Sequence, residues 1–331
     1  MTLIRMITTG GTIASRKTAA SDDVVAAVDG HQLLKEVEAY IEGICVEVRE
    51  FSNLGSFAID LEQSFSLARF IAESLASPSV DGVVVSHGTD TMEESVWLSE
   101  LVNNSEKPIV FTGAQRSNDT VGSDGPRNIG DAIRLAASPL ARGLGAVIVF
   151  EQDFHAARDV TKTHTSRVDT FASGEHGKLG EIDGATVSLY RKPLIRRSFE
   201  PEKIETAVDL VKMVIGMDGR FVRCAVASGA KAIVIEGFGR GNVTPSVLDA
   251  IRESISAGVL VFIASRCTQG RARPIYGGPG GGRELERAGA IFVGDLSGPK
   301  ARVLAAVLLG CSMEAVEIRR VFSYFGGDNG A

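Results

Sequence analysis

The sequence predicts an α/β protein of two domains, each built on a parallel sheet flanked by helices. Short runs of β-branched and apolar residues alternate with amphipathic segments almost throughout the chain, which is the order expected of parallel strands joined by crossover helices. The length of 331 residues suits two domains. The alternation dissolves into short polar, glycine-containing segments near 161–192, where hairpins are expected, and resumes after residue 206.

The interruption sets the expected domain boundaries. Residues 193–206 are charged, contain two prolines and lack periodicity, so we expect a linker there. A larger N-terminal α/β domain would span 1–192 and a smaller C-terminal α/β domain 207–331.

In the N-terminal part, four helical patterns lie between five apolar runs. The expected strands are Leu3–Thr9, Cys45–Phe51, Val83–Val85, Ile109–Thr112 and Ala146–Phe150. The expected helices lie near Gly30–Tyr40, Asp60–Ser74, Thr91–Asn103 and Asn128–Ala137.

The C-terminal part repeats this order. The expected strands are Leu210–Ile215, Ala232–Glu236, Val259–Ala264 and Ile291–Val293, and the expected helices are Pro245–Ser256, Pro299–Leu309 and Met313–Phe322. Thr244 before Pro245 has the pattern of an N-cap followed by proline at the first helical position.

Composition excludes several classes of function. The net charge is −6 and no basic block is large enough to form a face, which argues against nucleic-acid or anionic-membrane partners. No apolar run reaches the length of a membrane-spanning helix. The chain begins with a predicted strand and shows no leader peptide, so a cytoplasmic location is expected; a secreted chain that has lost its leader is the alternative.

The four cysteines, Cys45, Cys224, Cys267 and Cys311, are far apart in the sequence. This spacing favours free, mostly buried thiols and contains no zinc signature. The five histidines are not spaced as metal ligands either, so no metal site is expected.

Thr89 and Asp90 stand between the buried run Val83–Val85 and a helical pattern that begins near Thr91. The carboxyl end of a central parallel strand is where open α/β sheets bind ligands. The alternative is that these residues only cap the helix. His87, in the same turn, is interpreted as a packed histidine rather than a base.

A second strand-end motif is Gly10-Gly11-Thr12. Two glycines let the backbone turn sharply and approach a ligand, but a threonine hydroxyl is a nucleophile only when it is activated. The pattern lacks the lysine of a nucleotide phosphate loop. The glycine-rich segment 237–242 lacks the acidic partner of a dinucleotide site, so nucleotide binding is a minor alternative.

Together, the two motifs resemble the two signatures of the bacterial-type L-asparaginase family, which includes the glutaminase-asparaginases. The matching segments are Ile7–Ala14 and Gly82–Glu94, and the resemblance continues through Phe111–Ala114, Ser123–Asn128, Arg158–Thr163, Gly239–Asn242 and Lys300–Leu304. It covers essentially the whole chain.

The resemblance implies a fold of two α/β domains and an amidohydrolase without metal or organic cofactor. Thr12 matches the nucleophile that forms an acyl-enzyme. Thr89, Asp90 and Lys162 match a threonine–aspartate–lysine triad. A lysine desolvated in a closed site can lose its proton near neutral pH, so Lys162 would take a proton from Thr89 or from water while Asp90 orients it.

The resemblance also implies a substrate-binding set. Ser56 would contact the α-carboxylate, Asp90 the amino group, and the backbone carbonyl of Ala114 the leaving nitrogen. Asn242 and Glu284, with Glu286 as the competitor for the acid, would arrive from a neighbouring subunit, which implies at least a dimer, and the resemblance implies a homotetramer. The complete set is Gly11, Ser56, Gly88, Thr89, Asp90, Ala114, Asn242 and Glu284.

Two positions depart from the family pattern. The mobile lid after Thr12 carries a tyrosine in the family, whereas residues 15–28 contain none here. At the substrate-contacting turn many members have glutamine where this chain has Phe57. We expect either that Phe57 lowers affinity and disfavours glutamine, or that it points into the core.

The expected reaction is hydrolysis of L-asparagine to L-aspartate and ammonia, with relaxed glutaminase-asparaginase specificity as an alternative. An ammonia-yielding amidotransferase subunit is a second alternative, which the absence of an extra N-terminal module disfavours. A catalytically impaired amino-acid-binding protein is a third, because the lid tyrosine is missing.

Overall fold

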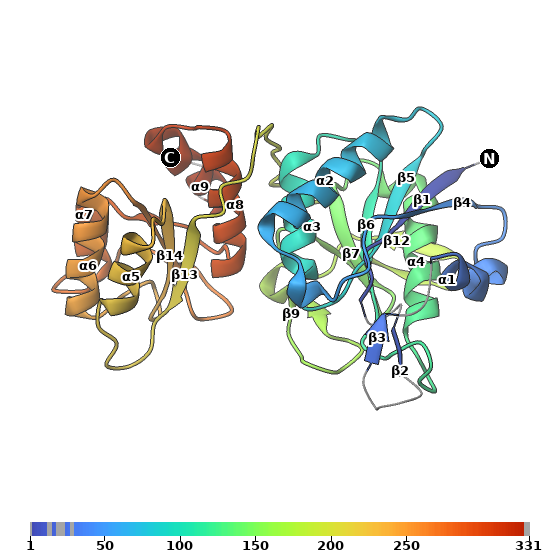
Figure 1. The fold of residues 1–331 in the computed structure, drawn as a ribbon, viewed down its shortest axis with the longest axis horizontal. Coiled ribbons are helices and arrows are strands. Elements are labelled where there is room, and N and C mark those ends of the chain that lie inside the picture. The colour runs from blue at the N-terminus through green and yellow to red at the C-terminus, as the bar shows by residue number, and fades with distance from the viewer. Residues whose placement is uncertain (1, 12–14, 18–23, 27–29, 328–331) are drawn as a thin grey trace. The chain divides into compact units, whose positions relative to one another are not determined.

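The computed structural model describes residues 2–11, 15–17, 24–26 and 30–327. The chain forms two compact units, Met1–Ser198 and Phe199–Ala331 (Figure 1). Each unit has its own sheet and its own hydrophobic core, so each is described separately.

The N-terminal unit contains an eight-stranded sheet in the order β12-β11-β8-β7-β6-β5-β1-β4. Five neighbouring strands are parallel: β4 (Cys45–Glu50), β1 (Leu3–Thr8), β5 (Gly82–Ser86), β6 (Ile109–Thr112) and β7 (Ala146–Phe150). The other three are antiparallel: β8 (Asp153–Ala156), β11 (Gly180–Asp183) and β12 (Thr186–Leu189).

This sheet is therefore mixed, whereas the sequence predicted a parallel one. The reversal occurs at Glu151 and Gln152, which have φ values of 47° and 71°. They form a two-residue connection between Phe150 and Asp153, which pair directly. Two residues cannot make a crossover, and positive φ at both positions suits a tight hairpin. The prediction missed this turn because it contains no glycine or asparagine.

Helices cover both faces of the N-terminal sheet (Figure 1). They are α1 (Gly30–Val37), α2 (Leu61–Ala76), α3 (Met92–Val102) and α4 (Gly125–Ala137), with 3-10 turns at Glu38–Tyr40, Ser56–Ala58, Pro139–Ala141 and Gly174–His176. Val84 joins the core under α1 and α4, while Val83 and Val85 face the side covered by α2 and α3. Because successive side chains point to opposite faces, burial on both faces explains the unbroken β-branched run.

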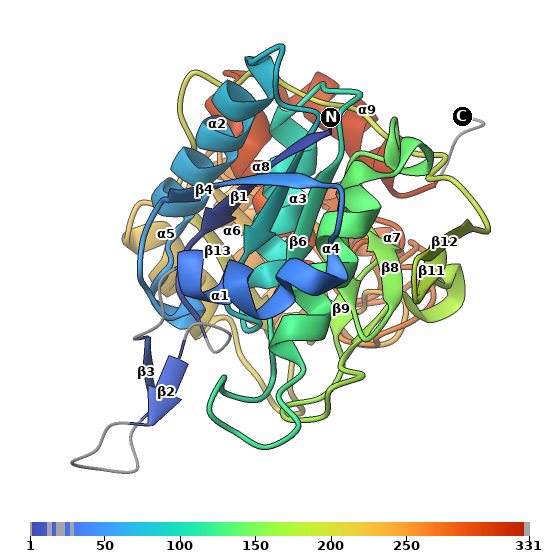
Figure 2. The same ribbon diagram turned by 90° about the vertical axis from the view of Figure 1, so that its right-hand side faces the viewer.

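Two small hairpins complete this unit. β2 (Ser15–Lys17) pairs with β3 (Val24–Ala26) and projects from the unit (Figure 2). β9 (Thr161–Lys162) pairs with β10 (Phe171–Ala172), with Lys162 opposite Phe171. The expected hairpins after residue 161 are thus confirmed by β9–β10 and β11–β12.

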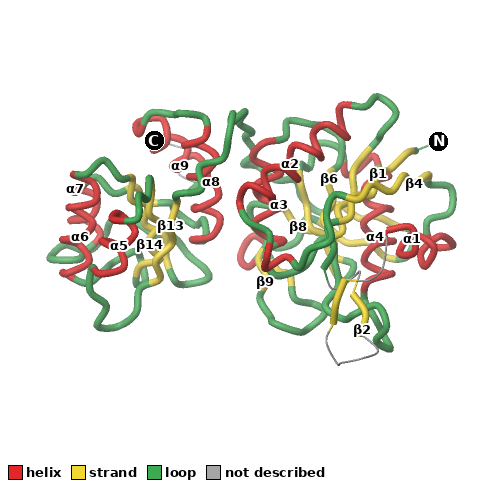
Figure 3. Tube along the Cα trace, viewed as in Figure 1, coloured by secondary structure: helices red, strands yellow, loops and turns green. Residues whose placement is uncertain are grey.

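The C-terminal unit has a parallel four-stranded sheet between two layers of helices (Figure 3). Its strands are β13 (Val208–Lys212), β14 (Ala232–Gly237), β15 (Leu260–Ser265) and β16 (Ile291–Phe292). Its helices are α5 (Arg220–Ala227), α6 (Pro245–Ser256), α7 (Gly282–Ala288), α8 (Gly298–Gly310) and α9 (Ala315–Phe325). The predicted cap is confirmed, since the Thr244 hydroxyl accepts a hydrogen bond from Val247 N.

The predicted fold class is confirmed: a larger N-terminal α/β unit precedes a smaller C-terminal one. The prediction of mostly buried thiols is wrong, because Cys224 and Cys267 are exposed and Cys45 and Cys311 are half-buried. Among the described residues, no helix is both long and apolar enough to cross a membrane.

Candidate active site

The strand-to-helix junction after β5 carries Thr89 and Asp90. Helix α3 begins at Met92, and its N-cap residue, Thr91, makes no side-chain capping bond. The Thr91 hydroxyl instead donates to the carbonyl of Ser56 at 2.9 Å. The capping-only alternative for this junction is therefore wrong, and the side chains of Thr89 and Asp90 are directed elsewhere.

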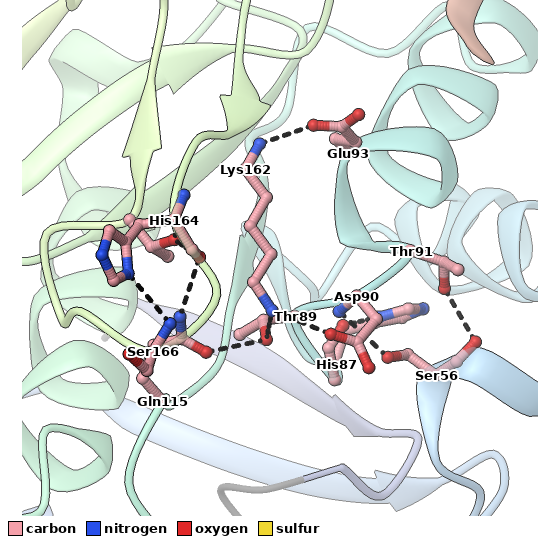
Figure 4. A network of polar contacts seen from close by, with 12 residues as sticks. Ser56, His87, Thr89, Asp90, Thr91, Glu93, Gln115, Lys162, His164 and Ser166 are labelled. Carbon is pink, nitrogen blue, oxygen red and sulfur yellow. Dashed lines mark hydrogen bonds and ion pairs between the residues drawn. The ribbon is translucent and has the colours of Figure 1, made fainter. Parts of the chain in front are cut away.

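Both side chains meet Lys162, which belongs to the β9–β10 hairpin (Figure 4). The Lys162 Nζ lies 2.8 Å from Thr89 Oγ1 and 2.8 Å from Asp90 Oδ1. The lysine side chain is 16% exposed and the aspartate side chain 57% exposed. One ammonium group thus joins a buried hydroxyl to a carboxylate that can still meet a ligand.

The Lys162 backbone is held as well. Its N–H donates to the Glu93 carboxylate at 2.6 Å, and Glu93 lies in the first turn of α3. A charge-assisted bond of this kind is stronger than one between neutral groups. Helix α3 therefore fixes the start of the lysine side chain, while Thr89 and Asp90 fix its end.

Ser56 lies directly beside this junction. It is buried, and its hydroxyl accepts a hydrogen bond from Asp90 N at 3.1 Å. A Cβ on Gly88 would approach Ser56 Oγ to 2.6 Å, and a Cβ on Gly11 would approach the Gly88 Cα to 2.6 Å. Glycine at position 11 therefore lets the ends of β1 and β5 come this close, and glycine at position 88 makes room for Ser56.

His87 is fully buried and contacts the Phe111 ring. Its Nδ1 donates to the Gly88 carbonyl at 2.7 Å, and burial lowers the pKa of the imidazole to about 4. The histidine is therefore neutral at pH 7 and orients the peptide between Gly88 and Thr89. This confirms the interpretation of His87 as a packed residue.

The end of β6 supplies the next part of the site. Ala114 is buried, and Gln115 Oε1 accepts a hydrogen bond from Thr89 Oγ1 at 3.1 Å. The buried Asp124 carboxylate accepts the backbone N–H groups of Gln115 and Arg116, each at 2.9 Å. Asp124 lies in a segment that matches the family pattern, but the sequence predicts no role for it, nor for Gln115 or Glu93.

Thr12, the expected nucleophile, lies outside the described residues, as do parts of the segment that follows it. The described chain leads up to it through Gly10 and Gly11, with φ values of 100° and 85°. Gly11 reaches the junction that carries Thr89, because its Cα lies against Gly88.

Asn242 and Glu284, the residues expected from a neighbouring subunit, belong to the C-terminal unit. Asn242 Oδ1 accepts a hydrogen bond from Gly282 N at 3.2 Å. Glu284 pairs with Arg252 at 3.0 Å and with Arg287 at 2.6 Å. The competitor, Glu286, is more exposed and pairs with Arg283 at 3.4 Å.

Within the described ranges, no three His, Cys, Asp or Glu side chains gather as metal ligands. What the site does assemble is an amine, two hydroxyls and a carboxylate at one sheet edge. Such a set can move a proton between a hydroxyl and an amine, and the carboxylate can pair with a cationic ligand.

Comparison with known proteins covers nearly the whole chain. The family model described as "Asparaginase, N-terminal" matches residues 3–195, and the one described as "Glutaminase/Asparaginase C-terminal domain" matches residues 207–322. An L-asparaginase of Bacillus licheniformis is 36% identical over 314 residues, which cover 95% of this chain and 97% of that protein.

Two further relatives widen the comparison. A subunit of the glutamyl-tRNA(Gln) amidotransferase of Pyrococcus abyssi is 33% identical over 96% of this chain and 74% of its own length. The solved structure of a probable cytoplasmic L-asparaginase from Campylobacter jejuni superimposes with a TM-score of 0.88, at 29% identity over 97% of this chain and 99% of that one.

Proposed function

The chain belongs to the asparaginase family of amidohydrolases, and on that premise we propose that it hydrolyses L-asparagine to L-aspartate and ammonia through an acyl-enzyme on Thr12. The observation that carries the proposal is the position of Lys162 Nζ, 2.8 Å from both Thr89 Oγ1 and Asp90 Oδ1. A hydroxyl, an amine and a carboxylate in this order form a proton-transfer chain beside the segment that leads to Thr12.

In the first step of the proposed reaction, Thr12 Oγ bonds to the amide carbon of the substrate. The carbon–nitrogen bond breaks, and ammonia leaves with the proton lost by the nucleophile. In the second step, Lys162 and Thr89 activate a water molecule that hydrolyses the ester and restores Thr12. Backbone N–H groups near Gly11 and Thr89 would stabilise the oxyanion in both steps.

The proposed substrate pose uses the groups around the triad. Ser56 is buried against Asp90 N and would receive the α-carboxylate. The Asp90 carboxylate is exposed enough to pair with the α-amino group. The backbone of Gly11 and Gly88 would line the reacting amide, and the Ala114 carbonyl would accept a hydrogen bond from its nitrogen.

We propose that the site is completed by the C-terminal domain, residues 207–331, of a neighbouring subunit. Asn242 lies in the loop that follows β14, and no described residue of this chain accepts a hydrogen bond from its Nδ2. The loops after β13 and β15 expose Ile215 (96%) and Tyr276 (57%). Exposed apolar side chains and an amide donor in loops at the carboxyl ends of neighbouring strands suit a subunit interface. We propose a homotetramer arranged as a dimer of dimers, with Glu284 as the intersubunit acid.

Two alternatives within the family are supported by the relatives. The name of the C-terminal family model includes glutaminase, which supports relaxed specificity, and the Pyrococcus abyssi relative is an amidotransferase subunit. We propose a cytoplasmic location, which is the location given in the description of the Campylobacter jejuni structure.

A coupled ammonia assay on the purified protein, with asparagine and glutamine and without a partner protein, tests the activity. Turnover of asparagine in excess over glutamine is the expected result. Comparable rates on both would favour the glutaminase-asparaginase alternative. Turnover that requires an added synthetase or tRNA would favour the amidotransferase alternative, and asparagine binding without turnover would contradict the proposal.

The shared site is tested by subunit exchange. Thr12→Ala and Asn242→Ala proteins, each inactive alone, are mixed under conditions in which exchange is demonstrated by mass. Mixed oligomers contain sites with neither substitution if the site is shared, so activity should return. No recovery after demonstrated exchange would show that each site lies within one chain.

A further inference from the structure

Gln115 connects two parts of the site through the two ends of its amide group (Figure 4). Its Oε1 lies 3.1 Å from Thr89 Oγ1. Its Nε2 lies 3.2 Å from the Arg167 carbonyl and 3.5 Å from the His164 carbonyl. Both carbonyls belong to the loop that joins β9 to β10.

The orientation of this amide follows from its partners. Backbone carbonyl oxygens only accept hydrogen bonds, so the NH₂ end must face the loop. The oxygen then faces Thr89, and because Oε1 only accepts, the Thr89 hydroxyl is the donor. In this arrangement the hydroxyl hydrogen of Thr89 points toward Gln115.

This orientation determines the bond between Thr89 and Lys162. With its hydrogen directed to Gln115, Thr89 Oγ1 accepts from Lys162 Nζ at 2.8 Å, and the same nitrogen donates to Asp90. For neutral Lys162 to take the proton of Thr89, the hydroxyl hydrogen must turn from Gln115 to Nζ. The Thr89 hydroxyl therefore has two competing acceptors.

Gln115 is held firmly enough to act as one of the two acceptors of the Thr89 hydrogen. Its backbone N–H donates to Asp124 Oδ2 at 2.9 Å. The fully buried Asn128 donates to that same oxygen at 3.3 Å and to the Gly113 carbonyl at 2.9 Å. Helix α4 thus fixes the backbone on both sides of Ala114.

The loop at the other end of the amide carries Lys162 at its base. Thr163 N donates to the Thr170 carbonyl at 2.7 Å, which closes the loop, and Lys162 pairs with Phe171 in the hairpin below. A bond from Gln115 to the Arg167 carbonyl therefore holds the lysine hairpin against the end of β6.

We propose that Gln115 is a positioning residue with two effects. Its oxygen accepts the Thr89 hydroxyl hydrogen and holds that hydroxyl where the hydrogen can turn to Lys162, and its NH₂ group ties the Lys162 hairpin to β6. The first effect rests on the proposed function of the triad, whereas the second does not.

Gln115→Met keeps the length of the side chain and removes both ends of the amide. We expect kcat for asparagine to fall about tenfold, because Thr89 loses the hydrogen bond that holds its hydroxyl beside Lys162, and one lost hydrogen bond of ordinary strength has about this effect. KM should change less than about twofold, because Gln115 contacts the hydroxyl rather than the expected substrate groups. Loss of active protein would also lower the apparent kcat at unchanged KM, so kcat is calculated per folded protein, as measured by circular dichroism.

Limited trypsin digestion tests the tether, the bond from Gln115 Nε2 to the Arg167 carbonyl, independently of activity. Trypsin cuts after Arg167, whose side chain is 65% exposed and whose carbonyl is the one that Gln115 holds. Gln115→Met should accelerate cleavage at Arg167 about fivefold relative to cleavage elsewhere. Gln115→Glu keeps an acceptor for Thr89 but offers no donor to the loop, so it should accelerate cleavage equally and retain more of kcat than the methionine variant.

Gln32→Met, the same substitution on α1, is the matched control. It should change neither kcat nor the rate of cleavage at Arg167. Unchanged kcat in Gln115→Met would overturn the effect on Thr89, and unchanged cleavage at Arg167 in both Gln115 variants would overturn the tether. If the wild-type protein hydrolyses no amide, the proposed function fails, and the digestion still decides the tether.

Discussion

At the junction after β5, the Thr89 hydroxyl accepts a hydrogen bond from Lys162, whereas at the junction after β14, Thr244 uses its hydroxyl to cap the following helix. Both threonines follow a buried parallel strand and precede a helix. The Thr244 hydroxyl accepts a hydrogen bond from Val247 N and donates one to the Met217 carbonyl. Both its acceptor and its donor are therefore paired with backbone groups.

The difference lies in what other segments bring to each junction. Lys162 and Gln115 reach Thr89 from two separate elements, while Thr244 meets only backbone groups. The same residue type in the same local setting is thus part of the proposed triad in one unit and caps a helix in the other. Local sequence predicts the junction, and the distant partner decides its role.

The largest effect should come from removing the amine at the first junction. Lys162→Met takes away the group that joins Thr89 to Asp90, so kcat should become undetectable while the protein stays folded. Steady-state ammonia release tests this expectation, and a folded methionine variant with normal kcat would remove Lys162 from the mechanism.

Thr89→Val deletes the hydroxyl and keeps the shape of the side chain. We expect kcat to fall by at least about a thousandfold, because no neighbouring hydroxyl duplicates the proton transfer. Ammonia release is measured beside circular dichroism to establish folding. Near-normal turnover would mean that the Thr89 hydroxyl, like the Thr244 hydroxyl, takes no part in the reaction.

His87, also at the first junction, should make stability depend on pH. Burial lowers its pKa from 6.5 to about 4, so the unfolded chain binds a proton in this range and the folded chain does not. Stability is therefore complete above pH 6.5 and is lost as the pH falls toward 4, by about 3 kcal/mol in all.

Urea unfolding of the wild type and His87→Gln at pH 7 and pH 5 isolates this contribution. The wild type should lose about 2 kcal/mol more than the variant over this interval. His155, whose pKa burial also lowers to about 4, remains in both proteins and cancels. Equal losses would show that His87 is protonated alike in both states.

Phe57 follows Ser56, the residue that contacts the first junction at Asp90 N. Its side chain is 81% exposed, so the expectation that it points into the core is wrong, and its ring lies beside Gly55. Phe57→Gln adds a hydrogen-bonding group next to Ser56, and KM for asparagine should fall about ten- to a hundredfold. Values of kcat/KM for asparagine and glutamine that stay unchanged in a folded variant would exclude Phe57 as a substrate determinant.

The smallest effect belongs to the second junction. Thr244→Val removes the cap of α6 and should lower the free energy of unfolding by about 1 kcal/mol, with kcat within about twofold of wild type. Urea unfolding and ammonia release measure the two quantities on one preparation. A large loss of kcat without loss of stability would reverse the contrast with Thr89.

The sequence predicted the α/β class because the apolar runs of strands and the periodic patterns of helices can be recognised within a few neighbouring residues. The same local information predicted that Thr89 and Asp90 follow a buried strand, that Gly10 and Gly11 form a sharp turn, and that Thr244 caps a helix. Lys162 was assigned by resemblance, since nothing in its own surroundings marks it. The catalytic and binding roles given to the site residues, Thr12, Asn242 and Glu284 among them, stay predictions.

Only the tertiary structure decided which side chains meet. Lys162 lies 72 positions from Asp90 in the sequence, and Gln115 lies 26 positions from Thr89; contacts over such separations have no periodic signal in the chain. The reversal of strand direction at Glu151 and Gln152 could not be predicted from the sequence either. Both residues have positive φ without being glycine, and this conformation is set by the two strands that the turn joins. Backbone preferences act over a few residues, whereas hydrogen bonds between side chains depend on where the packed sheet places them.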